Sequence, residues 1–161
     1  MLGIVKTNET INALMAIFEK HKNDRICVIG TMCCGKTTLV RQLSQYNCVD
    51  ADDEVWPQIS EEKTTALSRK PITKGIMDSV YTLMYEKTSV RPGAPLFGIA
   101  ILDCEVVVYL DISPQLLKKH CDMRGDTDYV DALYVKKRIE EDCATHKEKG
   151  EKVFYYLRVT E

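Results

Sequence analysis

Short apolar runs alternate with longer amphipathic stretches along most of the chain. The runs are rich in β-branched and aromatic side chains, and each has the length of a buried strand. Strands that alternate with helices indicate a parallel sheet with helices on both faces, so we expect an α/β fold of three layers. The runs that predict strands are residues 25–29, 48–50, 96–102, 105–110 and 153–159.

Apolar residues three or four positions apart predict helices between these runs. Residues 8–18 carry such a face, with Asn8 as the expected cap, and belong to a helical extension at residues 1–24. The pattern leaves open whether this extension packs on the core or binds a partner. The other predicted helices are residues 37–43, pieces within 54–90 that are broken at Pro57 and Pro71, a helix opened by Ser113 and Pro114, and one from about Tyr129 to Lys149.

The strands predicted at 96–102 and 105–110 lie close together in the sequence. Only residues 99–104 separate Gly98 from the second of them, whereas neighbouring parallel strands normally need a crossover of about a dozen residues or more. Two alternatives follow. Either the third strand lies earlier in the chain, or the connection is reduced to a bare turn.

Composition narrows the class of protein. The chain has 161 residues, which is enough for one full core, so we expect a single domain over residues 1–161. Hydrophobic residues make up 45% and charged residues 29%, and the net charge of −2 with no basic block argues against a nucleic-acid partner. No apolar run is long enough to cross a bilayer, and no signal-peptide core opens the chain, so we expect no membrane partner.

A phosphate-binding pattern, G-x-x-x-x-G-K-[ST], lies between the first predicted strand and the helix that follows it. Its glycines let successive backbone N–H groups curl around a phosphate, and the helix start adds partial positive charge. We therefore expect Lys36 to reach the β- and γ-phosphates of ATP and the Thr37 hydroxyl to hold Mg²⁺. The expected nucleotide-binding residues of this loop are Gly30, Thr31, Met32, Cys33, Cys34, Gly35, Lys36, Thr37 and Thr38.

The chain has seven cysteines, an odd number without the spacing of a disulfide framework. This usage favours reduced thiols and a cytoplasmic location. Two of the cysteines, Cys33 and Cys34, lie inside the phosphate-binding pattern. Oxidation at these positions could block the phosphate site, because a thiol at a helix start is prone to ionise.

Three aspartates, Asp50, Asp52 and Asp53, follow the second predicted strand. Carboxylates one residue apart at a strand end can point into the same cleft. We expect Asp50 to hold Mg²⁺ and Asp52 to orient or deprotonate a substrate hydroxyl. Acids here also suit the first turn of a helix, and we assign Asp53 mainly to such a cap. Asp103 is an alternative ligand for the metal if the whole of 96–102 is a strand.

Arg124 lies in a glycine-containing hinge between two predicted helices, and about residues 122–131 form a short expected lid. An arginine in such a hinge can swing over bound phosphates and neutralise charge in the transition state. Arg138, on the next helix, is a second candidate for the nucleotide, with a solvated helix face as an equal alternative. We expect Lys136 and Lys137 to lie on that solvated face.

With these residues in place, the chain resembles the small P-loop kinases, the group that includes shikimate, gluconate and nucleoside monophosphate kinases. The resemblance implies a three-layer P-loop nucleoside triphosphate hydrolase fold and ATP-dependent phosphoryl transfer to a small molecule. Residues 26–43 carry the phosphate loop, and residues 49–52 are similar to the D-[ST]-D segment of shikimate kinases. Residues 106–114 are similar to the group's fourth strand and the start of its next helix. Residues 124–139 are similar to the lid of adenylate kinases.

The chain also departs from these families, which leaves the phosphoryl acceptor open. It lacks the D-G-[FY]-P-R motif of adenylate kinases, the G-G-G segment of shikimate kinases and the second lid arginine. A shikimate-like, polyol-like or nucleotide-like acceptor is compatible with the pattern, and Arg69, Lys74 or Arg91 could hold an anionic one. Two other functions stay open, a nucleotide-binding module without transfer and a nucleoside triphosphate hydrolase acting on water. The oligomeric state is open as well.

Overall fold

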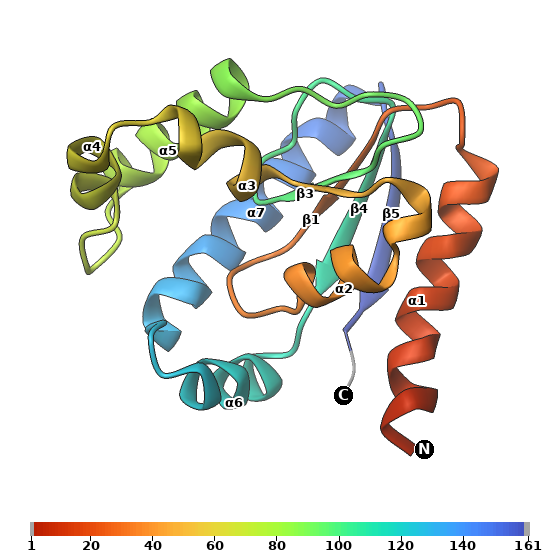
Figure 1. Ribbon diagram of the computed structural model, residues 1–161, viewed down its shortest axis with the longest axis horizontal. Coiled ribbons are helices and arrows are strands. Elements are labelled where there is room, and N and C mark those ends of the chain that lie inside the picture. The colour runs from red at the N-terminus through yellow and green to blue at the C-terminus, as the bar shows by residue number, and fades with distance from the viewer. Residues whose placement is uncertain (1, 160–161) are drawn as a thin grey trace.

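Five strands form one all-parallel sheet in the computed structural model of the protein (Figure 1). The structure describes residues 2–159, and their side chains from residue 9 onward. The strand order is β2-β3-β1-β4-β5, so β1 lies at the centre. The expected parallel α/β architecture is confirmed. The strands are β1 Ile26–Ile29, β2 Val49–Asp50, β3 Leu96–Gly98, β4 Val106–Asp111 and β5 Val153–Arg158.

Helices cover both faces of the sheet, which is consistent with the three expected layers (Figure 1). One face packs against α1 (Leu2–Lys20), α2 (Lys36–Gln42) and α6 (Pro114–Arg124). The other face packs against α3 (Ala51–Val55), α5 (Lys74–Lys87) and α7 (Tyr129–Lys149). The remaining short elements are α4 (Glu61–Leu67) and two 3₁₀ turns, η1 (Ser44–Tyr46) and η2 (Trp56–Gln58).

Side chains of the central strand alternate between the two faces of the sheet. In β1, Ile26 and Val28 belong to the cluster under α1, α2 and α6. Cys27 and Ile29 belong to the cluster under α3, α5 and α7. All four are buried because helices cover both faces. This explains why the strand appears in the sequence as a continuous apolar run rather than as an alternating one.

The N-terminal helix belongs to the core of the fold. Leu14 and Phe18 of α1 are buried in the cluster formed with β1, β3 and β4. The sequence left open whether this segment binds a partner, and its packing assigns it to the sheet. The helix begins at Leu2, so the expectation that Asn8 caps its start is wrong. Apolar residues also precede Asn8, which is why the helix extends past it.

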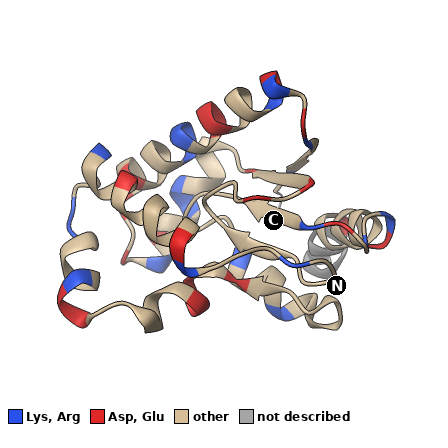
Figure 2. Cartoon of the chain, turned by 90° about the horizontal axis from the view of Figure 1, so that it is seen from above, with Lys and Arg blue, Asp and Glu red and all other residues tan. Residues whose placement is uncertain are grey.

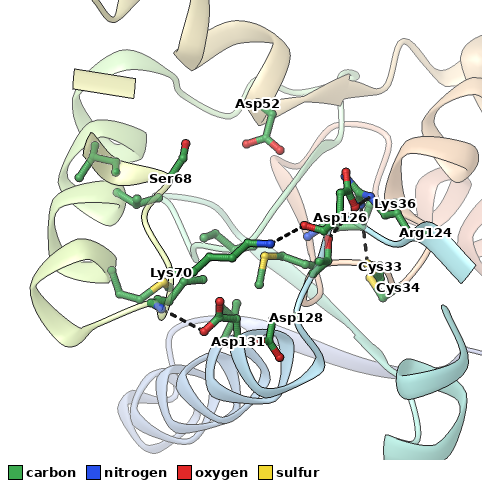
Figure 3. Close-up of a pocket in the computed structure, with 18 of the residues that line it drawn as sticks. Cys33, Cys34, Lys36, Asp52, Ser68, Lys70, Arg124, Asp126, Asp128 and Asp131 are labelled. Atoms are coloured by element: carbon green, nitrogen blue, oxygen red, sulfur yellow. Dashed lines mark hydrogen bonds and ion pairs between the residues drawn. The ribbon is translucent and has the colours of Figure 1, made fainter. Parts of the chain in front are cut away.

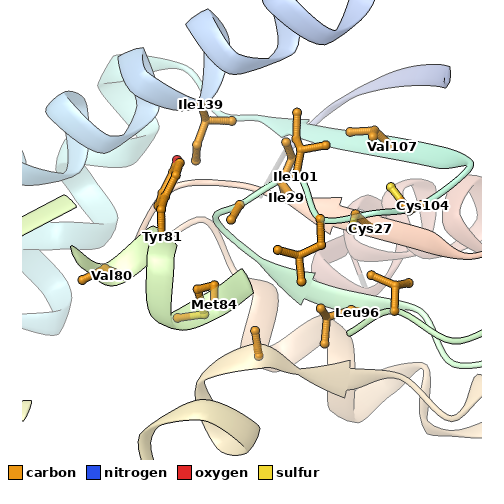
Figure 4. Packing of buried hydrophobic residues seen from close by; sticks show 14 of the residues in the cluster. Cys27, Ile29, Val80, Tyr81, Met84, Leu96, Ile101, Cys104, Val107 and Ile139 are labelled. Carbon is orange, nitrogen blue, oxygen red and sulfur yellow. The ribbon is translucent and has the colours of Figure 1, made fainter. Parts of the chain in front are cut away.

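A coil without a helix connects β3 to β4. Since β1 lies between these two strands, the chain crosses over β1 through residues 99–105. The sequence left two alternatives open, an earlier third strand or a short connection after it. The structure confirms the short connection. Four side chains of the coil are buried on the face of α5 and α7, namely Ala100, Ile101, Leu102 and Cys104 (Figure 4).

Two tyrosines of α5 supply hydrogen bonds that the coil cannot make internally. The Tyr81 hydroxyl donates to the Ile99 carbonyl at 3.1 Å, and the Tyr85 hydroxyl donates to the Ile101 carbonyl at 3.0 Å. A helical crossover would satisfy such carbonyls within itself, whereas a buried coil needs other donors. Burial raises the pKa of both tyrosines, so both hydroxyls keep the proton that they donate well above neutral pH.

Asp103 lies at the end of the sheet opposite the phosphate loop. Its exposed carboxylate pairs at 2.9 Å with Arg25, which directly precedes β1, and Glu105 pairs with the same guanidinium. The phosphate loop follows the other, carboxyl end of β1. The strand predicted over 96–102 ends at Gly98. Asp103 therefore cannot act as a metal ligand beside the phosphate loop.

None of the helices within residues 2–159 is both long and apolar enough to cross a lipid bilayer. Figure 2 shows acidic and basic positions interspersed over the helices and loops, without a block of one sign. This distribution accords with the small net charge of −2.

We expect Tyr81→Phe to lower the free energy of unfolding by about 1–2 kcal/mol, because the Ile99 carbonyl loses its donor. Urea unfolding followed by circular dichroism measures this change. Tyr134→Phe alters an exposed tyrosine of α7 and is the matched control, with an expected change below about 0.5 kcal/mol. A loss for Tyr81→Phe no larger than that of the control would contradict the role of Tyr81 in holding the coil.

Candidate active site

A cleft of about 540 Å³ lies at the carboxyl end of the sheet (Figure 3). Ligands of open parallel sheets bind at this edge, beyond the ends of the strands. The cleft is lined by the phosphate loop, the start of α3, residues 67–72, one face of α5, the end of α6, the lid and the start of α7. Segments that are far apart in the sequence thus meet at one site.

The phosphate loop is concave because two of its residues adopt left-handed backbone conformations. Cys33 has φ +65° and Gly35 has φ +97°. Such residues turn neighbouring N–H groups toward a common point, as an anion site requires. Gly30 is needed for close packing, since a Cβ at this position would lie 2.6 Å from Cys34 Sγ. The backbone geometry therefore agrees with the motif.

Two side chains anchor the loop to the rest of the fold. Thr31 is buried, and its hydroxyl donates to the Ala132 carbonyl of α7 at 2.6 Å. Met32 packs against the hydrophobic clusters on both faces of the sheet. Any contribution of Thr31 to phosphate binding, which the sequence predicts, would therefore come from its backbone.

Lys36, Thr37 and Thr38 begin α2 and line the cleft. The Lys36 ammonium donates to the Gly30 carbonyl and, at 3.3 Å, to the Gly98 carbonyl at the end of β3. Thr37 and Thr38 are exposed at the start of the helix. These positions place one cation and two hydroxyls at the loop, as the phosphate-binding pattern predicts.

Of the three aspartates around the end of β2, Asp52 lines the cleft. Its carboxylate accepts a hydrogen bond of 3.0 Å from the indole nitrogen of Trp56, which lines the cleft as well. Asp50 does not line the cleft. Its side chain caps α3 by accepting from the Asp52 N–H at 3.0 Å, and burial raises its pKa. Asp53 lies in the first turn of α3 as expected, but the capping residue is Asp50, the expected metal ligand, and not Asp53.

The end of α6 contacts the phosphate loop through Cys33. The His120 ring of α6 donates through Nδ1 to the Cys33 carbonyl at 2.9 Å, and Arg124 Nη1 lies 3.8 Å from Cys33 Sγ. Arg124 also pairs with Asp126 at 2.8 Å. The Asp126 carbonyl accepts from Lys70 at 2.7 Å, across the cleft (Figure 3). The lid therefore links the phosphate loop to residues 67–72, with Arg124 at the loop.

The structure does not bring Arg138 to the cleft, so its expected place at the nucleotide is wrong. The guanidinium pairs with Asp78 at 2.8 Å and lies 4.7 Å from the centre of the Tyr81 ring, which ties α7 to α5. Lys136 is not solvated as expected, because its side chain is 13% exposed and pairs with Asp111 at 3.2 Å. Both outcomes arise because these residues lie on faces of α7 that meet other elements, α5 for Arg138 and the end of β4 for Lys136.

Asp131 is a cleft residue that the sequence did not reveal. It lies in the first turn of α7, is 4% exposed, and lines the cleft (Figure 3). Its carboxylate accepts a hydrogen bond of 3.0 Å from the Ile72 N–H. In the sequence it resembles an ordinary acid in the first turn of a helix, so no local pattern marks it.

The half of the cleft away from the phosphate loop is largely apolar. Of the cations considered for an anionic acceptor, Arg69 lines the cleft beside Lys70, whereas Lys74 and Arg91 do not. The apolar residues come mostly from α5 and the segments packed on it, and are Trp56, Leu67, Ile72, Ile76, Met77, Val80, Met84, Ile99 and Val135.

Comparison with known proteins adds no relative. No protein-family model matches the chain, and no curated protein matches it significantly.

We expect Gly30→Ala to lower the free energy of unfolding by about 1–3 kcal/mol, because the new methyl group meets the buried Cys34 sulfur. Urea unfolding is again the measurement. Gly75→Ala in α5 is the matched control, since its Cβ has no neighbour closer than 3.9 Å. It should leave stability within about 1 kcal/mol of the unaltered protein or raise it. Equal effects of the two substitutions would contradict the close packing at Gly30.

Proposed function

We propose that the protein is an ATP-dependent kinase with a P-loop nucleoside triphosphate hydrolase fold, which transfers the γ-phosphoryl group to a small molecule. The observation that carries this proposal is that Lys36, Asp52 and Arg124 line one cleft. A phosphate loop alone would support nucleotide binding. An acid and an arginine on the same cleft are the further groups that phosphoryl transfer uses.

The phosphate loop fits the phosphates of ATP. Its left-handed residues Cys33 and Gly35 make the backbone concave, and Lys36 supplies a cation. We propose Thr37 as the protein ligand of Mg²⁺, because it is exposed on the cleft whereas Asp50 caps α3. Bound Mg²⁺ would neutralise negative charge on the β- and γ-phosphates.

Each of the three side chains would have a separate role in transfer. Lys36 and Arg124 would stabilise negative charge on the transferring group, from the loop and from the lid. Asp52 would accept the proton of the acceptor hydroxyl as that oxygen attacks the γ-phosphorus and ADP leaves. The hydrogen bond from Trp56 orients the Asp52 carboxylate for this task.

The apolar half of the cleft favours an acceptor with a ring or other apolar body and an anionic group. Arg69 and Lys70 lie on this part of the cleft, and the buried Asp131 can accept a hydrogen bond from one polar group of the acceptor. An open-chain polyol would bury hydroxyls against apolar side chains without partners, at about 1–3 kcal/mol for each group. The polyol-like acceptor therefore has less support than the other two.

Two alternatives have less support. A hydrolase acting on water loses its candidate acid, because Asp103 pairs with Arg25 at the other end of β1. A nucleotide-binding module would need the phosphate loop but would leave Asp52 and Arg124 on the cleft without a role. We also propose a cytoplasmic location, because all seven cysteines are unpaired.

We expect ADP release from ATP and Mg²⁺ to depend on one member of an acceptor panel and to fall at least about 10²-fold in Lys36→Ala, because the phosphates lose their cation. The panel contains nucleoside monophosphates, nucleosides, shikimate and gluconate. Arg41→Ala removes an exposed cation from the same helix and should keep the turnover of the unaltered protein.

Each other result of this assay points to a different function. Release without an acceptor would indicate a hydrolase. ATP binding without release, across the whole panel, would favour the binding module. Unchanged turnover or ATP binding in Lys36→Ala would overturn the assignment of the phosphate loop itself.

We expect Asp52→Asn to lower kcat by about 10²–10⁴-fold and to leave ATP affinity nearly unchanged, because the amide can still accept from Trp56 but cannot take a proton. Steady-state kinetics and a nucleotide titration measure the two quantities. Asp53→Asn, at the next position of α3 and off the cleft, is the matched control. Equal losses of turnover and affinity in Asp52→Asn would place Asp52 on the metal ion instead.

A further inference from the structure

Cys33 of the phosphate loop contacts His120 and Arg124 of α6, and Cys121 lies between these two residues on the same helix. Cys33 is partly exposed and lines the cleft. Cys121 of α6 is 2% exposed and belongs to the hydrophobic cluster against which Cys33 packs. The proposed kinase mechanism uses neither thiol.

We propose that Cys33 and Cys121 form a reversible oxidation site, at which a peroxide converts the two thiols to a disulfide that joins the phosphate loop to α6. The disulfide itself does not depend on the proposed function. Its effect on nucleotide binding rests on the proposed function.

Cys33 is the thiol placed to react first. Its partly exposed side chain lies on the open cleft, where a small peroxide has access. Arg124 Nη1 lies 3.8 Å from the sulfur, so a guanidinium borders the thiol. The hydrogen bond from His120 to the Cys33 carbonyl, at 2.9 Å, keeps the residue against α6.

Cys121 is the thiol placed to react second. Burial and the neighbouring Cys33 thiol raise the pKa of Cys121 to about 11, so this thiol is protonated at neutral pH. Its burial also keeps it from solvent and from other oxidants.

The chemistry balances in two steps with hydrogen peroxide as the oxidant. The Cys33 thiolate attacks one peroxide oxygen, the O–O bond breaks, and a sulfenic acid and one water form after proton uptake. The Cys121 sulfur then attacks the Cys33 sulfur, and the sulfenic oxygen leaves as the second water. Two thiols have lost two electrons and two protons, and one peroxide has become two waters.

The other cysteines are less suited to this reaction. Cys34 is 1% exposed beneath Gly30, and burial raises its pKa. Cys27 and Cys104 also lie close to each other, but they are only 1% and 4% exposed, so a peroxide has little access to either. Cys48 is partly exposed but lies off the cleft, and burial raises its pKa to about 11.

A bond from Cys33 to α6 would affect the loop directly. Cys33 is one of the two left-handed residues that make the phosphate loop concave. Fixing its sulfur to α6 would prevent the loop from adjusting its backbone around the phosphates. Bound nucleotide would in turn cover Cys33 and slow its oxidation.

The test treats the reduced full chain with stoichiometric hydrogen peroxide and maps its tryptic peptides with and without dithiothreitol. Trypsin releases residues 26–36 and 120–124 as separate peptides, and only the second contains Cys121. We expect a dithiothreitol-sensitive link between these two peptides and a fall from seven free thiols to five per chain.

Single substitutions identify the sulfurs. Cys33→Ser and Cys121→Ala should each abolish the linked peptide, and Cys48→Ser, the matched control, should keep it. A link that persists in Cys33→Ser would assign the reaction to Cys27 or Cys34 and overturn the proposal. So would a bond between Cys33 and Cys34, or a Cys33 oxidised in the unaltered protein without a link to Cys121.

A nucleotide titration separates this proposal from the kinase assignment. We expect oxidation to abolish ATP binding in the unaltered protein, dithiothreitol to restore it, and Cys121→Ala to bind ATP both before and after peroxide. If the reduced protein binds no ATP but forms the linked peptide, the proposed function fails and the oxidation site stands. If the linked protein binds ATP as the reduced protein does, the regulatory effect is overturned.

Discussion

The close packing at Gly30 is the constraint on which the candidate site depends. With no side chain at this position, the Cys34 sulfur can lie beneath the loop. The Gly30 N–H donates to the Gly98 carbonyl at 3.1 Å, and the Gly30 carbonyl accepts from Lys36. One residue thus joins the end of β1, the end of β3 and the loop lysine. A side chain at this position would meet the Cys34 sulfur and Leu110, so the loop that makes these contacts would have to shift.

Because no helix connects β3 to β4, α5 has two roles in the structure. Its tyrosines Tyr81 and Tyr85 bind the carbonyls of the coil that replaces the crossover. Its residues Ile76, Met77 and Val80 line the apolar half of the cleft. The helix that lines the apolar half of the cleft therefore also holds the sheet connection. Substitutions on α5 act on the shape of the cleft and on stability together.

Local patterns predicted most of the fold and the part of the site formed by one continuous segment. The phosphate loop, its strand and its helix are adjacent in the chain, so a short motif determines their geometry. Residues whose place depends on packing between distant segments were not predicted. Arg138 lies on the α7 face that meets α5, and Asp131 reaches the cleft beside a segment that precedes α5. Two acids one residue apart at a strand end are expected to share the cleft. Only Asp52 lines it, because α3 begins immediately after β2 and takes Asp50 as its cap.

Trp56 gives this arrangement a spectroscopic property. It is the single tryptophan of the chain, it lies on the cleft, and its indole nitrogen is 3.0 Å from the Asp52 carboxylate. All tryptophan emission from the protein therefore originates one hydrogen bond away from the acid assigned to proton transfer. Because indole emission responds to nearby charge and hydration, the unlabelled protein contains a fluorescent reporter of the state of its own candidate active site.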